Sequence, residues 1–222
     1  MAVLRELTET EVVALYEDAG GWWIYDHAGD PKAPHAELTS GLCSDGYIDS
    51  SKVLCDPAST ELLAFNLKLR IGAAEYRPAT DWVVGSPYAA ITFSFEFARQ
   101  VGAKHGFAEK DPENPKGFVW TNRFVIPGGA LVLQVEELVT TLGTSLKVRQ
   151  AVERGNPHPV RFAPDVATLI YRPARLQGGI IDVISLVARE IKSWEPGECP
   201  LCARGSSRLR PKQHWQELAR GR

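Results

Sequence analysis

The residues with the clearest chemical potential lie between Leu131 and Ser145, in the segment LVLQVEELVTTLGTS. An apolar run, predicted to be a strand, leads to the adjacent carboxylates Glu136 and Glu137 and then to a turn rich in hydroxyl groups. The turn residues expected to bind a phosphate are Thr140, Thr141, Gly143, Thr144 and Ser145. Backbone N–H groups and hydroxyls at a helix N-terminus bind anions, and carboxylates accept hydrogen bonds from sugar hydroxyls. The segment therefore predicts a site for a sugar phosphate.

The same pattern has an alternative interpretation. Neighbouring residues of a strand point to opposite faces, so both carboxylates can serve one ligand only if the strand has ended at Glu136. Otherwise Glu136 and Glu137 are a surface acidic pair, and the threonines cap the next helix. The spacing alone leaves both interpretations open.

Cys199 and Cys202 form a Cys-x-x-Cys pair, which could be half of a structural zinc site. Such a site needs four ligands, and Cys43 and Cys55 are distant in the sequence, while His214 is a lone candidate. We therefore favour free thiols in a turn, as expected in a reducing compartment. No histidine motif nearby supports a cysteine nucleophile.

Three basic residues could contact an anionic ligand. Lys110 and Arg123 lie in the polar stretch 107–129, where they either close over a ligand or are simply solvated. Arg172 follows a predicted strand, which places it either at the ligand edge of a parallel sheet or in a rim salt bridge. Trp120 lies in the same polar stretch and could cover a ligand. The histidines at 35, 105 and 158 show no partner pattern and are interpreted as surface or core residues.

The elements that must position these residues alternate between strands and helices. Helices are predicted at 1–19, 58–72, 89–100 and 145–153, and buried strands at 82–84, 131–135, 166–171 and 179–188. The stretch 22–57 is irregular with short strands, and 107–129 is a loop or a hairpin. This alternation is typical of an α/β fold with a parallel sheet flanked by helices. The basic tail is interpreted as a solvated C-terminus; its charges are Arg204, Arg208, Arg210, Lys212, Arg220 and Arg222.

Composition limits the class of protein. The 222 residues suffice for one sizeable core, and 44% hydrophobic with 23% charged residues is ordinary for a globular chain. A net charge of −2 does not suggest a nucleic-acid scaffold, so an anionic substrate must be bound by local geometry. The N-terminal residues lack the apolar stretch of a signal peptide, which predicts a cytoplasmic protein without a membrane partner.

The segment from Leu131 to Ser145 resembles the phosphoribosyl-diphosphate (PRPP) motif of type I phosphoribosyltransferases. Several further segments narrow the resemblance to orotate phosphoribosyltransferase, and they occur in that family's order from about Glu37 to Cys202. They are ELTSGLCSDGYI from Glu37, WVVGSPYAA from Trp82, FAEK from Phe107 with Arg123-Phe124, IYRP from Ile170, and CPLC from Cys199.

The resemblance implies roles for the matching residues. Glu136 and Glu137 would hold the ribose hydroxyls, and the Thr140–Ser145 turn would hold the 5-phosphate. Lys110 would act with them in catalysis on a loop that Arg123 borders. Gly85, Ser86 and Pro87 would form the pyrophosphate loop, while Arg172, Ser40 and Gly41 would bind the base.

The family resemblance implies transfer of phosphoribosyl from PRPP to orotate, with Mg²⁺ accompanying PRPP and no protein side chain assigned as its ligand. It also implies a homodimer. The expected organisation is one structural domain with an N-terminal hood segment (1–75), a phosphoribosyltransferase core (76–195) and a C-terminal tail on the hood (196–222). Departures from the motif are the Glu-Glu pair, Leu142 in place of glycine, and a pyrophosphate loop without its usual glycines. They leave open a non-catalytic binding protein, or a transferase for another base.

Overall fold

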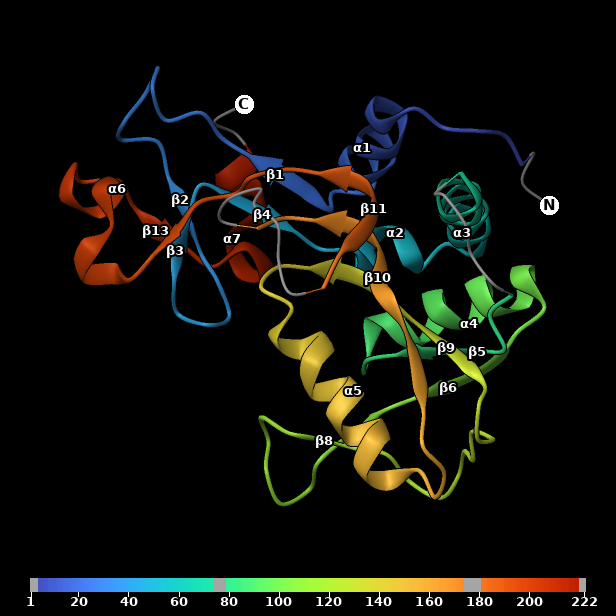
Figure 1. The fold of residues 1–222 in the computed structure, drawn as a ribbon. Coiled ribbons are helices and arrows are strands. Elements are labelled where there is room, and N and C mark those ends of the chain that lie inside the picture. Colours follow the sequence, from blue (N-terminus) through green and yellow to red (C-terminus); the bar gives the residue numbers. More distant parts are fainter. Residues whose placement is uncertain (1–3, 74–78, 174–180, 220–222) are drawn as a thin grey trace.

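The chain folds around a five-stranded parallel sheet, which forms the middle layer of the computed structural model (Figure 1). The structure describes residues 4–73, 79–173 and 181–219. The sheet has the order β11-β10-β9-β5-β6, and every neighbouring pair in it is parallel. Its strands are β5 (Trp82–Gly85), β6 (Lys104–Phe107), β9 (Leu131–Val139), β10 (Arg161–Tyr171) and β11 (Val183–Ala188). The predicted α/β class is confirmed.

Alternate residues of a strand face opposite sides of the sheet, and in this sheet apolar residues occur on both sides. On β9, Leu133 and Val135 belong to one hydrophobic cluster, whereas Val132 between them belongs to another. On β5, Val83 and Val84 divide between the same two clusters. Elements must therefore cover the sheet on both sides.

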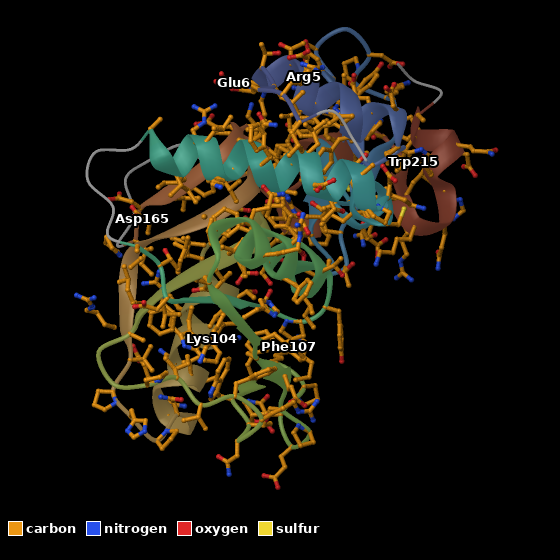
Figure 2. The ribbon with its side chains drawn as sticks, turned by 90° about the vertical axis from the view of Figure 1, so that its right-hand side faces the viewer. Arg5, Glu6, Lys104, Phe107, Asp165 and Trp215 are labelled. Carbon is orange, nitrogen blue, oxygen red and sulfur yellow. The ribbon has the colours of Figure 1, made fainter. Side chains whose placement is uncertain are left out.

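Helices provide that cover. On one face α3 (Pro57–Gly72) packs against α4 (Ala89–Val101), with α1 (Glu9–Asp18) and α2 (Ser51–Leu54) beside them. Figure 2 shows α3 crossing above α4, with Lys104 and Phe107 of the edge strand β6 below both helices. On the other face lies α5 (Gly143–Gly155), whose Val148 and Val152 pack with Val132. The four predicted helices are confirmed as α1, α3, α4 and α5, with shifted ends, whereas α2 was not predicted.

Local signals set the beginnings of two helices. Thr8 and Glu11 form a reciprocal capping box at the start of α1. The Asp56 carboxylate accepts a hydrogen bond from the Ser59 N–H at 2.9 Å, and Pro57 occupies the first turn of α3. Each cap satisfies amide groups that have no partner within the helix.

A smaller unit, which we call the hood, combines the two ends of the chain. Its four-stranded sheet has the order β12-β3-β2-β13, and β1 pairs separately with β4. The elements are β1 (Trp22–Ile24), β2 (His35–Glu37), β3 (Cys43–Ser44), β4 (Gly46–Ile48), β12 (Ser193–Trp194), η1 (Pro196–Glu198), α6 (Pro200–Ala203), β13 (Arg208–Leu209) and α7 (Pro211–Ala219). In Figure 1 these blue and red segments lie together at one end of the sheet.

The prediction of a solvated C-terminal tail was wrong as far as Ala219. Strand β13 pairs with β2 in parallel, and Leu218 of α7 is buried. The indole Nε1 of Trp23 donates a hydrogen bond to the Leu218 carbonyl at 2.9 Å. Apolar residues among the basic ones, which the charge pattern hid, hold this segment on the hood. Arg220 and Arg222 lie outside the described residues.

The polar stretch after the second parallel strand forms the expected hairpin, β7 (Glu109–Lys110) with β8 (Phe118–Val119). Trp120 follows it but is buried in the core, where its Nε1 donates to the Phe124 carbonyl at 3.0 Å. The prediction that Trp120 could cover a ligand was therefore wrong. A Cβ on Gly106 would lie 2.6 Å from the Trp120 ring, so the ring requires glycine at that position of β6. Strand β6 itself was not predicted.

None of the helices in the described part of the chain combines the length and the apolar character needed to cross a membrane.

Candidate active site

A cavity of about 210 Å³ opens where β5 and β9 end. The sheet order reverses between these two strands, because β6 extends the sheet on one side and β10 and β11 extend it on the other. Ligands of parallel sheets bind at such reversal points, beyond the carboxyl ends of the strands. Its lining residues are Ser86, Pro87, Lys110, Phe118, Glu136, Glu137, Leu138, Val139, Thr140, Leu142, Thr144 and Ser145. Much of the predicted sugar-phosphate site therefore surrounds one cavity.

Glu136 is the buried carboxylate of this cavity. Its Oε2 accepts a hydrogen bond from Ser86 Oγ at 2.5 Å, and its Oε1 accepts one from Gln134 Nε2 at 2.7 Å. Burial, followed by the charge of Glu137, raises the pKa of Glu136 to about 8. Removal of the carboxylate from water outweighs the two hydrogen bonds, which by themselves favour the charged form. The group is thus poised to change its protonation state near neutral pH.

Gln134 and Arg149 hold the Glu136 carboxyl in place. Residues two apart on a strand share a face, so Gln134 lies beside Glu136 on the side of the sheet that α5 covers. From α5, Arg149 Nε donates to Gln134 Oε1 at 3.1 Å, which turns the amide nitrogen of Gln134 toward Glu136. Arg149 also donates to the Asp165 carbonyl at 2.7 Å. We did not single out Gln134 or Arg149 from the sequence, although the period of two already placed Gln134 on the same face as Glu136.

The side chain of Glu137 points to the face of the sheet opposite to that of Glu136. Its surroundings there are Tyr16, Asp49 and Ser50: Ser50 Oγ donates to the Glu137 carbonyl at 3.4 Å, and Tyr16 donates to Ser50 at 3.0 Å. Burial and the charge of Asp49 raise the pKa of Glu137. Strand β9 continues to Val139, beyond the predicted range 131–135, so the condition that the strand ends at Glu136 is not met. Both glutamates nevertheless line the cavity.

The turn after β9 delivers the N-terminus of α5 to the cavity. No side chain caps this helix, whose first residue is Gly143. The unpaired first-turn amides and the positive end of the helix dipole favour an anion at this point. Of the predicted phosphate-binding residues, Thr140, Thr144 and Ser145 line the cavity, whereas Thr141 and Gly143 do not.

Leu142 adopts the left-handed conformation that glycine usually supplies, with φ +62°. For a residue with a Cβ this conformation costs roughly 1–2 kcal/mol. Its side chain packs against the small hydrophobic cluster of Val139, Val166 and Ile181, which offsets part of that cost. The turn therefore keeps a glycine-like backbone despite the substitution, although Leu142 also borders the cavity.

Lys110 reaches the cavity from the hairpin, whereas Arg123 does not. The Lys110 side chain is exposed and its Nζ lies 4.4 Å from the Phe118 ring centroid. Arg123 instead approaches Glu109, with 3.6 Å between Nε and Oε1, and is absent from the cavity lining. Gly85 is buried at the end of β5, where a Cβ would overlap the Ser94 side chain. Close packing of α4 on β5 thus explains Gly85, while Ser86 and Pro87 reach the cavity.

Arg172 follows β10 and is largely removed from water. Its backbone N–H donates to the Val139 carbonyl at 2.9 Å, which fixes it beside the end of β9. Within residues 4–73, 79–173 and 181–219, no acceptor contacts its buried Nε. Burial lowers the pKa of Arg172, and the nearby Tyr47 opposes that shift. A buried guanidinium donor without an acceptor is well suited to an anionic ligand group.

Ser40 and Gly41 lie in a second, larger cavity of about 400 Å³ in the hood. It is lined by Tyr47, by the turn between β2 and β3, and by residues of the C-terminal segment such as Arg210. Arg208 and Arg210 both pair with Glu37 at 3.0 Å, and these contacts lower the pKa of Glu37. Ser40 and Gly41, two of the three predicted base-binding residues, thus do not share a cavity with the glutamates.

Several of the cysteines and histidines considered in the sequence analysis have partners that the sequence did not predict. Cys199 and Cys202 meet Cys43 and His35 in the hood, whereas Cys55 is exposed elsewhere and His214 pairs with Glu217. All four cysteines are free of disulfide bonds. His35 and Cys43 were not predicted to be partners, because only the interleaved hood sheet brings them to the Cys-x-x-Cys turn. His105 is partly buried against Ser94 at 2.8 Å, and burial lowers its pKa to about 4.

Solved structures show which class of fold this is. Orotate phosphoribosyltransferase from Aeropyrum pernix matches with a TM-score of 0.54 at 18% identity, over 80% of this chain and 93% of that chain. UMP synthase from Leishmania donovani matches with a TM-score of 0.58 at 16% identity, covering 96% of this chain and 41% of that longer chain. At these identities the likeness concerns the fold alone, and the fold is that of the type I phosphoribosyltransferases.

Sequence relatives identify the family. The orotate phosphoribosyltransferase of Heliobacterium modesticaldum is 31% identical over 178 residues, which are 80% of this chain and 88% of the relative. That of a Thermoanaerobacter species is 31% identical over 191 residues, or 85% and 93%. No protein-family model matches the chain. With relatives this similar over most of its length, the chain belongs to the orotate phosphoribosyltransferase family.

Proposed function

We propose that this protein transfers the phosphoribosyl group of PRPP to orotate, giving orotidine 5-phosphate and pyrophosphate in pyrimidine nucleotide biosynthesis. The observation that carries the proposal is the cavity at the reversal point of the sheet. There, two glutamates near the end of β9 line the same cavity as Thr144 and Ser145 in the first turn of the uncapped α5, in a chain of this family. The protein is accordingly a pentosyltransferase.

The residues of the cavity each have a role in this reaction, as does Arg172, which lies beside the end of β9 but outside the cavity lining. The Thr140–Ser145 turn and the first amides of α5 hold the 5-phosphate. Glu136 and Glu137 accept hydrogen bonds from the ribose hydroxyls; Glu136 offers the lone pairs that Ser86 and Gln134 leave free. Lys110 neutralises the departing pyrophosphate from the hairpin. Arg172 binds the carboxylate of the base through its unpaired Nε.

The reaction displaces pyrophosphate at the anomeric carbon of the ribose, where positive charge develops. The chain's contribution is to align the two anionic substrates, to stabilise that charge and to exclude water. The negative charge of an ionised Glu136 or Glu137 would stabilise the developing positive charge across a short, poorly solvated distance. Because the pKa of Glu136 is raised, this carboxyl would release a proton if ligand binding stabilises its charged form.

Mg²⁺ is proposed to enter with PRPP, bound to its phosphate oxygens. The carboxylates at the cavity fit this partner, because Mg²⁺ prefers oxygen ligands and usually keeps several waters. The pKa values of Glu136 and Glu137 are raised, and a bound cation would lower them by stabilising both carboxylates in their charged form. A homodimer and a cytoplasmic location complete the proposal, by resemblance to the family.

The non-catalytic alternative is not favoured. It rested on Leu142 and on the pyrophosphate loop without its usual glycines. The turn at Leu142 has the positive φ that a glycine would give, with the leucine side chain packed on Val139 and Val166. Ser86 and Pro87 of the altered loop still line the cavity. The relatives over most of the chain are orotate phosphoribosyltransferases.

The test is the loss of orotate absorbance on mixing the protein with PRPP and Mg²⁺, alongside adenine and uracil as competing bases. We expect turnover with orotate that Glu137→Gln lowers strongly. The matched variant Glu195→Gln, at an exposed glutamate of the hood, should retain wild-type turnover. Turnover with adenine or uracil in place of orotate would refute the base assignment, and no turnover with any base would refute the proposed reaction.

A further inference from the structure

Four potential metal ligands converge in the hood, away from the proposed catalytic cavity. They are His35 on β2, Cys43 on β3, and Cys199 and Cys202 at the start of α6. Their ligand atoms all lie within 4.8 Å of one another. His35, Cys43 and Cys199 are buried and Cys202 is partly buried, so the cluster is nearly closed to solvent.

Three of the six distances between ligand atoms match those of a tetrahedral zinc site. Cys43 Sγ lies 3.7 Å from Cys202 Sγ, and His35 Nε2 lies 3.7 Å from Cys199 Sγ and 3.4 Å from Cys202 Sγ. With Zn–S near 2.3 Å and Zn–N near 2.0–2.1 Å, tetrahedral ligands are separated by about 3.8 Å for two sulfurs and about 3.5 Å for sulfur and nitrogen. A disulfide would instead require about 2.05 Å between the sulfurs.

The protonation of His35 is already the one that a metal requires. Ser206 Oγ donates its single proton to the Ala33 carbonyl at 2.6 Å, so it must accept at its 2.7 Å contact with His35 Nδ1. Nδ1 therefore carries the ring proton, and the lone pair of Nε2 faces Cys199 and Cys202. Metal-binding histidines are oriented in this way by a partner on the other ring nitrogen.

The Cys-x-x-Cys turn has two features that favour thiolates and hence metal binding. Cys199 is the N-cap residue of α6, and its sulfur accepts a hydrogen bond from the Cys202 N–H at 3.5 Å. An amide directed at the sulfur stabilises a thiolate. Arg208 of the neighbouring β13 interacts electrostatically with Cys43 and Cys202, which would balance the excess negative charge of three thiolates around a divalent ion.

We propose that His35, Cys43, Cys199 and Cys202 form a structural Zn²⁺ site that joins the N-terminal hairpin of the hood to the C-terminal segment. A full set of four protein ligands leaves no open position for substrate, which is the mark of a structural site. Two ligands flank the β2–β3 turn that carries Ser40 and Gly41, and two lie in the turn that leads to β13. The metal thus braces the wall of the larger hood cavity.

The test begins with the wild-type protein, purified without chelators or a metal-affinity step, and measures zinc by elemental mass spectrometry. We expect about one zinc per chain, a lower melting temperature after treatment with a strong zinc chelator, and recovery on adding zinc. Replacement by Co²⁺ should give the intense visible and near-ultraviolet bands of tetrahedral cobalt bound to thiolates. These measurements need no variant, so a ligand substitution that fails to fold leaves the proposal testable.

Variants then locate the site. Cys43→Ser and Cys202→Ser should lose the zinc, and any folded product should no longer respond to the chelator. Cys55→Ser, at the exposed cysteine, should keep both the zinc and the response. Ser206→Ala keeps every ligand and should weaken zinc binding roughly 10-fold in a competition titration.

Two outcomes would overturn the proposal. One is a chain free of zinc that binds neither added Zn²⁺ nor Co²⁺ and whose thiols all titrate; the cluster would then be a packing contact. The other is an intact mass lowered by two hydrogens, which would identify a disulfide.

Discussion

The buried carboxyl of Glu136 makes a pH-dependent prediction about stability. In the folded protein its pKa is raised to about 8, with burial as the main cause, whereas the ordinary pKa of an exposed glutamate is 4.5. Below the pKa of the unfolded chain, Glu136 is protonated in both the folded and the unfolded protein, and the stabilising effect of the neutral carboxyl is fully present. As pH rises through the higher value, that contribution is lost, because the unfolded chain releases the proton first. Glu136→Gln removes this titration while keeping an uncharged group in contact with Ser86 and Gln134.

The magnitude follows from the two pKa values. Between them, the free energy of unfolding of the wild type should fall relative to Glu136→Gln by up to about 1.4 kcal/mol for each pH unit. From roughly pH 6 to pH 8 the difference should change by about 2 kcal/mol. Groups that titrate in both proteins cancel in this comparison, and the exposed control Glu195→Gln should follow the wild type throughout.

The assay is urea unfolding of the three proteins across this pH range, followed by tryptophan fluorescence. The linear extrapolation gives the free energy of unfolding at each pH. If the wild type and Glu136→Gln keep a constant difference over the range, then Glu136 is ionised in the folded protein and the described environment is incorrect.

Further predictions concern ligand binding and the turn. Binding of Mg²⁺-PRPP near pH 7 should release a proton in the wild type but not in Glu136→Gln, as measured by calorimetry in buffers of different ionisation enthalpy; equal release in both would exclude Glu136 as its source. Lys110→Ala should lower kcat/KM for PRPP by about 100-fold without loss of stability, whereas Arg123→Ala should change it little, and equal effects would remove the distinction between them. Leu142→Gly should be more stable than Leu142→Ala by about 1 kcal/mol in thermal unfolding, because only glycine relieves the positive φ; the reverse order would contradict the described turn. Arg172→Gln should raise the KM for orotate about 10-fold but not that for PRPP, and a matched rise in both would argue against base recognition.

The sequence predicted the sheet well where strands contain continuous apolar runs: the runs at 82–84 and 131–135 lie within β5 and β9, although β9 extends four residues further. It failed at β6, whose residues Lys104–Phe107 include only one large apolar side chain. That strand exists because Trp120 and β5 pack against it, a non-local cause without a local pattern.

The site was predictable where its residues are consecutive. Glu136, Glu137 and the turn to Ser145 lie on one strand-to-helix connection, so one motif located them together. Their orientation was not predictable, because the strand end depends on pairing of β9 with β10 as far as Val139.

Contacts between the chain ends were also outside the reach of local patterns. His35 and Cys43 meet Cys199 and Cys202 only because β2 and β3 lie between β12 and β13 in one sheet. The same interleaving turns a basic tail into part of the hood.

A crystal structure of the protein with Mg²⁺-PRPP would show whether the cavity at the end of β9 binds the sugar phosphate. We expect the 5-phosphate within hydrogen-bond distance of the first amides of α5 and the hydroxyls of Thr144 and Ser145, with the ribose beside Glu136 and Glu137. A phosphate bound elsewhere, or a Leu142 side chain occupying the phosphate position in crystals saturated with PRPP, would contradict the proposed function.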